Sequence, residues 1–380
     1  MTLSFPAAVF RGVDEPLQIE QVDLPDGPPP GEVLVELAAS GLCFSDLHVL
    51  RGDWPAPTPL VLGHEGAGVV RAVGAGVRRL REGDHVILCW TPSCGVCRFC
   101  ASGRPSLCDE AKAKASRHVM PDGTTRLRQG GVPVHSYIAL GTFGRFVMVQ
   151  ESAAIAIRRD VPLDLASLVG CAVTTGIGAV INTAKVEPGA SVLVLGCGGV
   201  GLSVVQGAAL ARAATIVAVD LDPEKRQLAT TLGATHALDG ADANLQGRLT
   251  ELGAGGGFDY AFEAIGAPAT TDVAIRSLGK GGTAVLVGQV PAGVTVPIDP
   301  LLISDQERVI RGSNYGSARP VVDFPRILDL YARGVINLDL MVTERIPLEE
   351  INSGFDAMRA HRGARTVVEF DHGLARASSM

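Results

Sequence analysis

Short apolar runs broken by Gly and Pro dominate the first third of the chain. Three of these runs have the residue preferences of β-strands: Val33–Leu37, Gly68–Val70 and His85–Leu88. The breaks between them, such as Asp26–Gly31, have the composition of turns and loops. This pattern predicts a small, irregular and mostly antiparallel β unit.

The pattern changes after about Cys171, where strand-like runs alternate with helical ones. Such alternation is typical of a parallel sheet with crossover helices. Asp222 as a cap and Pro223 at the first helical position predict a helix over Pro223–Leu232. The clearest predicted strands are Ser191–Leu195, Thr215–Asp220, Phe258–Glu263 and Thr283–Gly288.

The alternation stops after about Asn314. Beyond it, Arg365–Phe370 is predicted as one more strand, and the last ten residues are expected to be frayed. We find no internal repeat and no low-complexity segment.

Two uncharged stretches, Leu165–Ala184 and Pro188–Ala211, have the length of membrane spans. The second is rich in Gly, which favours a buried strand, a tight turn and a buried helix over a helix that faces lipid. The N-terminus lacks a charged segment followed by an apolar core, so no signal peptide is evident. We therefore expect a cytoplasmic protein with no membrane partner.

Composition and charge narrow the class further. The 380 residues allow two domains of ordinary size, and a hydrophobic share of 47% with 19% charged residues is that of a globular protein. The formal net charge is -7, and no block of Lys or Arg stands out. Nucleic acid is therefore not an expected partner.

A Gly-rich turn follows the predicted strand Ser191–Leu195 and precedes an apolar, helix-compatible run. In this context Gly residues permit a tight turn and bring the backbone close to a pyrophosphate at a helix N-terminus. Asp220 ends the next strand about 20 residues later, where an acid binds the adenosine ribose and repels a 2′-phosphate. We expect NAD, not NADP, and the alternative is a nucleotide-free domain of the same fold. The predicted cofactor residues of the turn are Gly196, Gly198, Gly199, Val200 and Gly201.

Eight cysteines occur in the chain, and four of them lie in one short segment. The segment contains Cys94, Cys97, Cys100 and Cys108. Four thiolates can close a tetrahedral shell around Zn²⁺ and leave no open position, which indicates a structural site. An iron–sulfur cluster and free thiols are the alternatives.

Cys43, His64 and Cys171 are far apart in the sequence, and spacing alone does not join them. Each also has an ordinary interpretation, as a buried thiol, a histidine in a turn or a cysteine of the core. A resemblance links them. Gly41–His48 and Gly63–Gly68 resemble the signature of zinc-containing medium-chain alcohol dehydrogenases, and the remaining motifs follow in that family's order.

The resemblance extends from about Pro6 to Phe370 and implies an α/β fold with two domains. Residues 1–172 and 315–380 would form a GroES-like, mostly β catalytic domain, with a structural zinc lobe at about 92–110. Residues 173–314 would form an inserted, doubly wound Rossmann domain that binds NAD. The segment Asp109–Phe143 resembles the long form of the family, which implies a homodimer.

The family also implies roles for residues near the first motif. Cys43, His64 and Cys171 match the ligands of a catalytic zinc with a fourth position open to the alcohol. Glu65 matches an acid near the metal, and Asp46 matches a residue that orients His64. The expected reaction passes through an alkoxide on zinc, with Ser45 and His48 as the proton relay.

Further matches concern the cofactor and the substrate. Thr175 resembles the residue against the nicotinamide, and Lys225 and Arg365 resemble contacts to the ribose and the pyrophosphate. Phe44 departs from the family, because many relatives carry Arg or His there. The predicted walls of the substrate channel are Trp54, Trp90, Tyr137 and Ile138. Two tryptophans would leave a narrow apolar slot for unbranched primary alcohols, although both could simply be core residues.

The expected function is hydride transfer between a primary alcohol or its aldehyde and NAD, with two zinc ions per chain. One alternative is a thiol-adduct formaldehyde dehydrogenase, which the chain's Phe44, Ser45, His48 and Lys112 disfavour. Another is a nicotinoprotein whose NAD never leaves. A non-catalytic relative is disfavoured because all the predicted ligands and relay residues are present.

Overall fold

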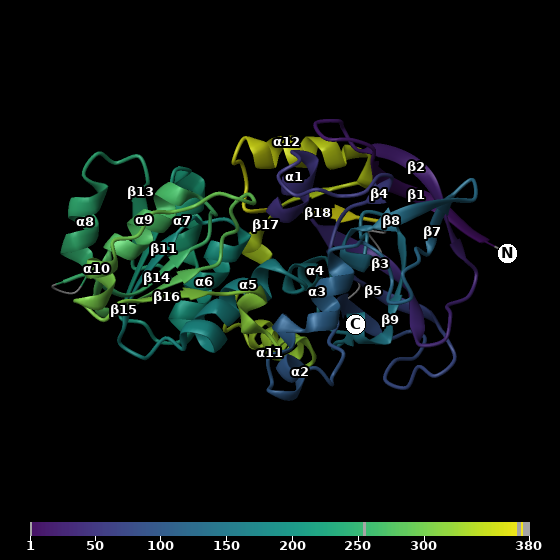
Figure 1. The fold of residues 1–380 in the computed structure, drawn as a ribbon, viewed down its shortest axis with the longest axis horizontal. Helices are drawn as coiled ribbons and strands as arrows, with labels where there is room; N and C mark the ends of the chain where they lie inside the picture. The colour runs from purple at the N-terminus through teal and green to yellow at the C-terminus, as the bar shows by residue number, and fades with distance from the viewer. Residues whose placement is uncertain (1, 254–255, 371–373, 375–380) are drawn as a thin grey trace.

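The protein consists of a β-rich half and a half built on a parallel sheet, lying side by side (Figure 1). The computed structural model describes residues 2–253, 256–370 and 374. The expected fraying of the last ten residues falls on positions of which only Leu374 is described.

The β-rich half contains a closed barrel and a seven-stranded sheet. The barrel strands, in spatial order, are β1 (Thr2–Phe10), β2 (Gln18–Pro25), β7 (Leu127–Gln129), β8 (Val132–Ser136) and β4 (Leu60–Val61). The sheet runs β10 (Ala154–Ala156), β6 (His85–Leu88), β5 (Glu65–Val73), β3 (Glu32–Gly41), β18 (Arg365–Glu369) and β17 (Val342–Ile346), with β9 (Phe146–Gln150) paired to β3. β18 pairs antiparallel with β3, so the end of the chain completes a sheet begun near its start.

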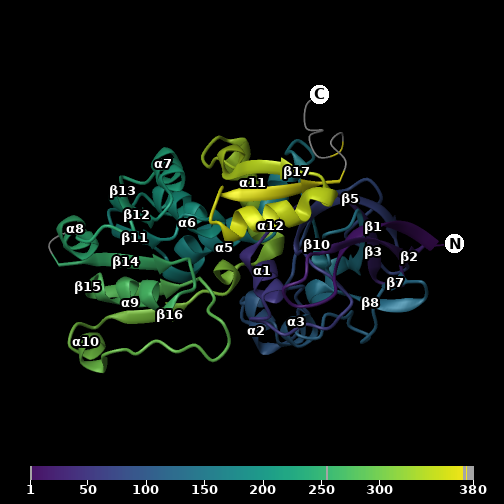
Figure 2. The same ribbon diagram turned by 90° about the horizontal axis from the view of Figure 1, so that it is seen from above.

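The other half contains one parallel, six-stranded sheet flanked by helices (Figure 2). Its strands, in spatial order, are β13 (His236–Asp239), β12 (Thr215–Asp220), β11 (Ser191–Leu195), β14 (Phe258–Glu263), β15 (Leu278–Leu286) and β16 (Val309–Gly312). The chain order reverses between β11 and β14. In doubly wound sheets, ligands bind at the carboxyl ends of the strands near this reversal.

Short helices connect the strands of both halves. In the β-rich half they are α1 (Phe44–Leu50), α2 (Arg98–Ala101), α3 (Asp109–Ala115), α4 (Leu163–Val169) and α12 (Ile351–Arg359). Around the parallel sheet they are α5 (Ala172–Gly178), α6 (Gly199–Leu210), α7 (Pro223–Thr231), α8 (Leu245–Leu252), α9 (Pro268–Arg276) and α10 (Pro300–Ser304). α11 (Pro320–Ala332) lies at the junction, where it packs against α4, α5 and β10.

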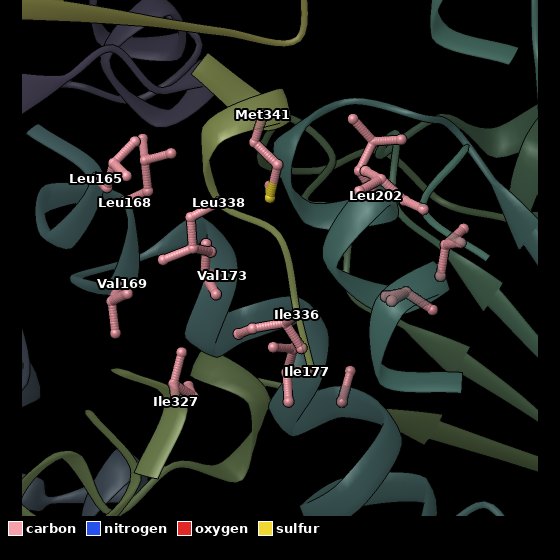
Figure 3. Packing of buried hydrophobic residues seen from close by; sticks show 14 of the residues in the cluster. Leu165, Leu168, Val169, Val173, Ile177, Leu202, Ile327, Ile336, Leu338 and Met341 are labelled. Atoms are coloured by element: carbon pink, nitrogen blue, oxygen red, sulfur yellow. The ribbon is translucent and has the colours of Figure 1, made fainter. Parts of the chain in front are cut away.

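A continuous apolar core fills the junction between the halves. Figure 3 shows side chains of α4, α5, α6 and α11 converging with the segment that carries Ile336, Leu338 and Met341. The uncharged stretch that includes α4 and α5 is thus a core element. No single helix among the described residues is long and apolar enough to cross a membrane. Leu163–Val169 and Ala172–Ala184 pass that test only as a pair, which bends by 48°.

The predicted elements are largely confirmed. β6, β11, β12 and β14 have the predicted bounds, and Asp222 caps α7 by accepting a hydrogen bond from the amide of Glu224. β15 differs because it begins at Leu278, five residues earlier than predicted, and its register with β14 shifts. β17 was missed, since the exposed polar residues in its middle hide the strand pattern.

Candidate active site

The N-terminus of α1 is fixed by a buried carboxylate. Asp46 is fully buried and accepts hydrogen bonds from the backbone amides of Cys43 (3.2 Å) and Gly63 (3.0 Å). Its Oδ1 also lies 3.3 Å from Nδ1 of His64. Because Asp46 engages Nδ1, the imidazole presents Nε2 in the opposite direction. The side chain of Asp46 therefore joins the start of α1 to the turn before β5, and it also orients the imidazole of His64.

Residues from three separate segments converge beside this carboxylate. Cys43 precedes α1, His64 and Glu65 lie where β5 begins, and Cys171 precedes α5. Their potential ligand atoms all lie within 4.8 Å of one another. All four residues are buried, and such a cluster of sulfur, nitrogen and oxygen atoms could hold a metal ion.

The charges of this cluster are strongly coupled. A hydrogen bond from Cys171 and the nearby His64 lower the pKa of the Cys43 thiol well below its ordinary value. Burial opposes charge on His64, but Asp46 and Cys43 together raise its pKa well above the ordinary value. The site therefore already favours a thiolate, the form of cysteine that binds metals.

Glu65 connects the cluster to the last strand. The guanidinium of Arg365 donates a hydrogen bond to Oε2 of Glu65, and both side chains are buried. Burial raises the pKa of Glu65 to about 8, against the opposing effect of Arg365. Two buried polar atoms, Oε1 of Glu65 and Nε of Arg365, lack hydrogen-bond partners among the described residues.

The Gly-rich turn lies against the same arginine. A Cβ at Gly199 would lie 2.4 Å from Cδ of Arg365, and a Cβ at Gly201 would lie 1.7 Å from the carbonyl oxygen of Gly196. Both positions therefore require Gly. A Cβ at Gly198 would instead meet nothing within 4 Å, so space for a ligand remains over the backbone at the start of α6.

Asp220 lies at the carboxyl end of β12, next to this turn. Its carboxylate accepts hydrogen bonds from the amides of Cys197 (2.6 Å) and Asp222 (2.9 Å). Lys225 is half-buried on the first turn of α7. Arg226, which the sequence did not single out, donates to the carbonyl oxygens of Asp220 and Leu221.

His48 lies on α1 with a partner that the sequence analysis missed. Its Nδ1 lies 2.8 Å from Oδ2 of Asp53, and its ring stacks on Trp54 with centroids 4.6 Å apart. The side chain of His48 is 12% exposed, which gives it access to solvent. Ser45 lies three residues earlier on the same helix, with Oγ 3.5 Å from Sγ of Cys43.

The predicted channel residues lie in two groups. Tyr137 packs edge-on against His64 at 5.7 Å, and the next residue, Ile138, has a left-handed backbone with φ of 46°. Trp90 stacks on Tyr315 at 4.2 Å, and the hydroxyl of Tyr315 donates to the carbonyl of Gly170, next to Cys171. Thr175 is buried on α5, where its amide donates to the carbonyl of Cys171.

The four-cysteine lobe forms a second cluster, in which one potential ligand atom of each cysteine lies within 4.8 Å of the others. Its residues are Cys94, Cys97, Cys100 and Cys108. Backbone amides of Cys100 and Asp109 lower the pKa of Cys97 to about 6, which favours the thiolate. Cys89 lies outside the cluster, and burial raises its pKa to about 12.

Comparisons with known proteins give the family. The profile described as "Alcohol dehydrogenase GroES-like domain" matches residues 29–159, and "Zinc-binding dehydrogenase" matches residues 199–333. The chain is 41% identical over 374 residues to "Alcohol dehydrogenase class-3" of Cereibacter sphaeroides, covering 96% of this chain and 99% of that protein. The chain belongs to the zinc-dependent alcohol dehydrogenase family.

Two further similarities agree with this membership. The "NDMA-dependent alcohol dehydrogenase" of Amycolatopsis methanolica is 40% identical, with 95% of this chain and 98% of that protein covered. A crystal structure of an "Alcohol dehydrogenase zinc-binding domain protein" from Burkholderia ambifaria superposes with a TM-score of 0.93 at 37% identity, covering 98% of this chain and 100% of that one. The predicted fold class, enzyme class, zinc and NAD are thereby confirmed for this member of the family.

The residues present fit both a zinc ion and NAD. Two thiols and an oriented imidazole form a donor set suited to zinc, and Glu65 adds a carboxylate oxygen that has no hydrogen-bond partner in the described part of the chain. Gly198 has open space above it, and the next residue, Gly199, packs against Arg365, whose Nε has no hydrogen-bond partner among the described residues; a pyrophosphate could bind there.

Proposed function

We propose that the chain oxidises primary alcohols to aldehydes, with NAD, at a zinc ion held by Cys43, His64 and Cys171. The observation that carries this proposal is the convergence of these three donors, together with Glu65, within 4.8 Å from three distant segments. Their burial keeps water from competing with the substrate except through the open position.

The bound groups supply the reactive chemistry: zinc polarises the alcohol oxygen, and NAD accepts the hydride. The protein moves the proton. Oγ of Ser45, beside Cys43, accepts the alcohol proton, and His48 lies one helical turn further along α1. Because Asp53 engages Nδ1 of His48, Nε2 is the atom that passes the proton to solvent.

We assign NAD binding to the residues predicted for it. Asp220 would accept the ribose hydroxyls, with Lys225 beside it, and the N-terminus of α6 would bind the pyrophosphate together with Arg365. Thr175 would pack against the nicotinamide. The proposed domains follow the sequence prediction, with residues 173–314 inserted between 1–172 and 315–380. The homodimer and the cytoplasmic location also stay predictions.

Metal analysis of paired variants tests the proposal. We expect two zinc ions per chain, of which Cys43→Ala loses one, together with turnover, while its melting temperature stays close to that of the wild type. Cys97→Ala should lose the other zinc and lower the melting temperature, because the lobe folds around its metal. Fully active protein with one zinc or none would contradict the proposal.

A turnover assay separates the two alternative activities. Formaldehyde with glutathione tests the thiol-adduct reaction, and an artificial acceptor tests whether bound NAD is reoxidised in place. We expect simple primary alcohols with added NAD to be turned over faster than either. NAD that stays with the protein through purification, with activity only on the artificial acceptor, would favour the nicotinoprotein.

A further inference from the structure

Tyr315 contacts the backbone directly before Cys171, one of the proposed ligands of the candidate zinc centre. Its hydroxyl donates a hydrogen bond to the carbonyl oxygen of Gly170, and the side chain is buried, since Tyr315 is only 2% exposed. The carbonyl of Gly170 and the amide of Cys171 belong to one planar peptide unit. A hydrogen bond that fixes this carbonyl therefore also fixes the plane from which the side chain of Cys171 projects.

The other contacts of this peptide unit are weak. Cys171 precedes α5 with φ of -145° and ψ of -78°, which is neither helical nor extended, and its side chain forms no capping hydrogen bond. Its amide lies 3.4 Å from the carbonyl oxygen of Leu168, which is longer than a usual N–H···O hydrogen bond. The hydroxyl of Tyr315 is therefore an important constraint on the orientation of Cys171.

The segment that carries Tyr315 is packed tightly enough to hold the hydroxyl in place. Tyr315, Gly316 and Ser317 all have left-handed backbone, with φ of 55°, 61° and 50°. A Cβ at Gly316 would lie 2.5 Å from the carbonyl oxygen of Thr174, so the segment lies directly against α5. Left-handed backbone costs free energy for a residue such as Tyr, and it persists where the surrounding contacts fix it. The stacking of Tyr315 on Trp90 at 4.2 Å is one of these contacts.

The same segment is joined to the four-cysteine lobe. The side-chain amide of Asn314 donates a hydrogen bond to the carbonyl oxygen of Ser106 at 2.8 Å. Ser106 lies two residues before Cys108, one of the four cysteines that could hold the lobe metal. Because Asn314 and Tyr315 are consecutive, two hydrogen bonds connect the backbone of the lobe to the backbone at Cys171.

We propose that Tyr315 is a positioning residue for the candidate zinc centre: its hydroxyl orients Cys171 for metal binding, and Asn314 supports Tyr315 from the lobe. The inference rests on the proposed function, because it takes Cys171 as a zinc ligand. Residues that orient metal ligands typically contribute a factor of about 10–100 to the affinity for the metal. Asp46 contacts the ring of His64 directly, whereas Tyr315 would act through the backbone of the ligand.

Competition for zinc with a chelator, in the full-length protein, tests the inference. Tyr315→Phe removes the hydroxyl and keeps the ring that stacks on Trp90. We expect this variant to raise the dissociation constant of the candidate zinc centre about tenfold and to leave that of the lobe unchanged. The binding step that Cys43→Ala lacks identifies the candidate zinc centre. Tyr331→Phe is the control, because it removes a hydroxyl that pairs with Asp339 and packs against the same apolar core.

Cobalt(II) in place of zinc gives a visible spectrum that depends on the geometry of the ligands. The spectrum of Cys43→Ala, which retains only the lobe metal, is subtracted to leave that of the candidate zinc centre. We expect the thiolate–cobalt bands to shift or weaken in Tyr315→Phe and to stay unchanged in Tyr331→Phe. A loss of stability alone would lower the melting temperature and leave this spectrum unchanged.

A double variant tests the support from the lobe. Asn314→Ala alone should raise the zinc dissociation constant of the candidate zinc centre about threefold, because the segment loses one hydrogen bond. Added to Tyr315→Phe, it should have no further effect, because the hydroxyl that it supports is absent. Independent effects of the two substitutions would contradict the role given to Asn314.

The outcomes separate this inference from the proposed function. Tyr315→Phe with the zinc affinity and cobalt spectrum of the wild type would overturn the inference and leave the proposed function intact. A variant in which only KM for alcohols changes, at saturating zinc, would also overturn it, because Tyr315 would then form the channel wall beside Trp90. If the wild type binds zinc at Cys171 but oxidises no alcohol, the proposed function fails, and the dissociation constants still decide the role of Tyr315. Wild-type protein that binds no zinc there would overturn both.

Discussion

Arg365, at the start of the last strand, forms a buried hydrogen bond with Glu65, which lies 300 residues earlier in the chain. This pair joins the candidate metal cluster to the Gly-rich turn, because Arg365 also packs against Gly199. One buried ion pair therefore connects the candidate metal site to the candidate cofactor site.

We expect Arg365→Leu to destabilise the protein by about 3–5 kcal/mol, because it leaves the carboxyl of Glu65 buried without its cation. The double variant Glu65→Gln, Arg365→Leu should cost less than the two single variants together. Urea unfolding of all four zinc-loaded proteins measures the coupling. Additive effects would show that the two side chains do not depend on each other.

Asp220 should set the preference for NAD over NADP. Asp220→Gly should lower the ratio of kcat/KM with NAD to kcat/KM with NADP by about fivefold or more. The substitution removes both an acceptor for the ribose hydroxyls and the charge that repels a 2′-phosphate. Arg226 offers no ready compensation, since it already contacts two carbonyls and Asp239. Wild-type protein that prefers NADP would refute the assignment.

The strands and the Gly-rich turn could be predicted because their signals are local. Val192–Leu195 is an unbroken apolar run followed at once by Gly196, so the strand and the Gly-rich turn support each other's interpretation. Cys43, His64 and Cys171 carry no such signal. Their meeting depends on how β5, α1 and α5 pack, so only resemblance to a family could join them in advance.

The partner of His48 was missed for a different reason. Asp53 lies five residues after His48, a spacing that could have suggested a partner for the imidazole.

The contribution of His48 to the rate of alcohol oxidation should be largest at low pH, where bases in the solvent are scarce. His48→Ala should slow alcohol oxidation up to roughly 100-fold at about pH 6, the low end of proton-transfer catalysis, and less as pH rises. Asp53→Asn should slow the reaction less than His48→Ala does, with the same dependence on pH, because the imidazole of His48 is then oriented less firmly through Nδ1. Added imidazole should restore part of the rate of His48→Ala. A deficit that is constant across pH and insensitive to imidazole would argue against the relay.

His118 should make the fold sensitive to acid. Burial, with a smaller contribution from His135, lowers its pKa to about 4, and Nδ1 accepts a hydrogen bond from the amide of Ile138. The unfolded chain takes up this proton near the ordinary pKa of about 6.5. The contribution of neutral His118 to the free energy of unfolding is therefore fully present above about pH 6.5, and it is lost as the pH falls toward 4.

The control for this effect is His118→Asn, which keeps a hydrogen-bond acceptor but cannot gain the proton. Its melting temperature should fall less steeply between about pH 6.5 and 4 than that of the wild type. Zinc ligands titrate in both proteins, so the difference between the two curves isolates His118. Parallel curves would assign the acid sensitivity to other groups.

Trp90 should limit the width of the substrate channel near the candidate zinc centre. Its indole stacks on Tyr315, whose hydroxyl contacts the residue before Cys171, so the ring lies close to the metal ligands. Trp54, stacked on His48, would form the opposite wall. Two indoles leave little room at the carbon that reacts, which should favour unbranched primary alcohols over bulky secondary ones.

Trp90→Ala should therefore raise kcat/KM for branched or aromatic alcohols relative to a short linear one. The change should correspond to about 1–3 kcal/mol per displaced group, because apolar pockets discriminate weakly between shapes. Trp90→Phe keeps most of the ring and should shift the ranking less, which separates channel width from a general loss of stability that slows every substrate. If the wild type already prefers bulky secondary alcohols, or if Trp90→Ala leaves the ranking unchanged, Trp90 packs in the core without bounding the channel.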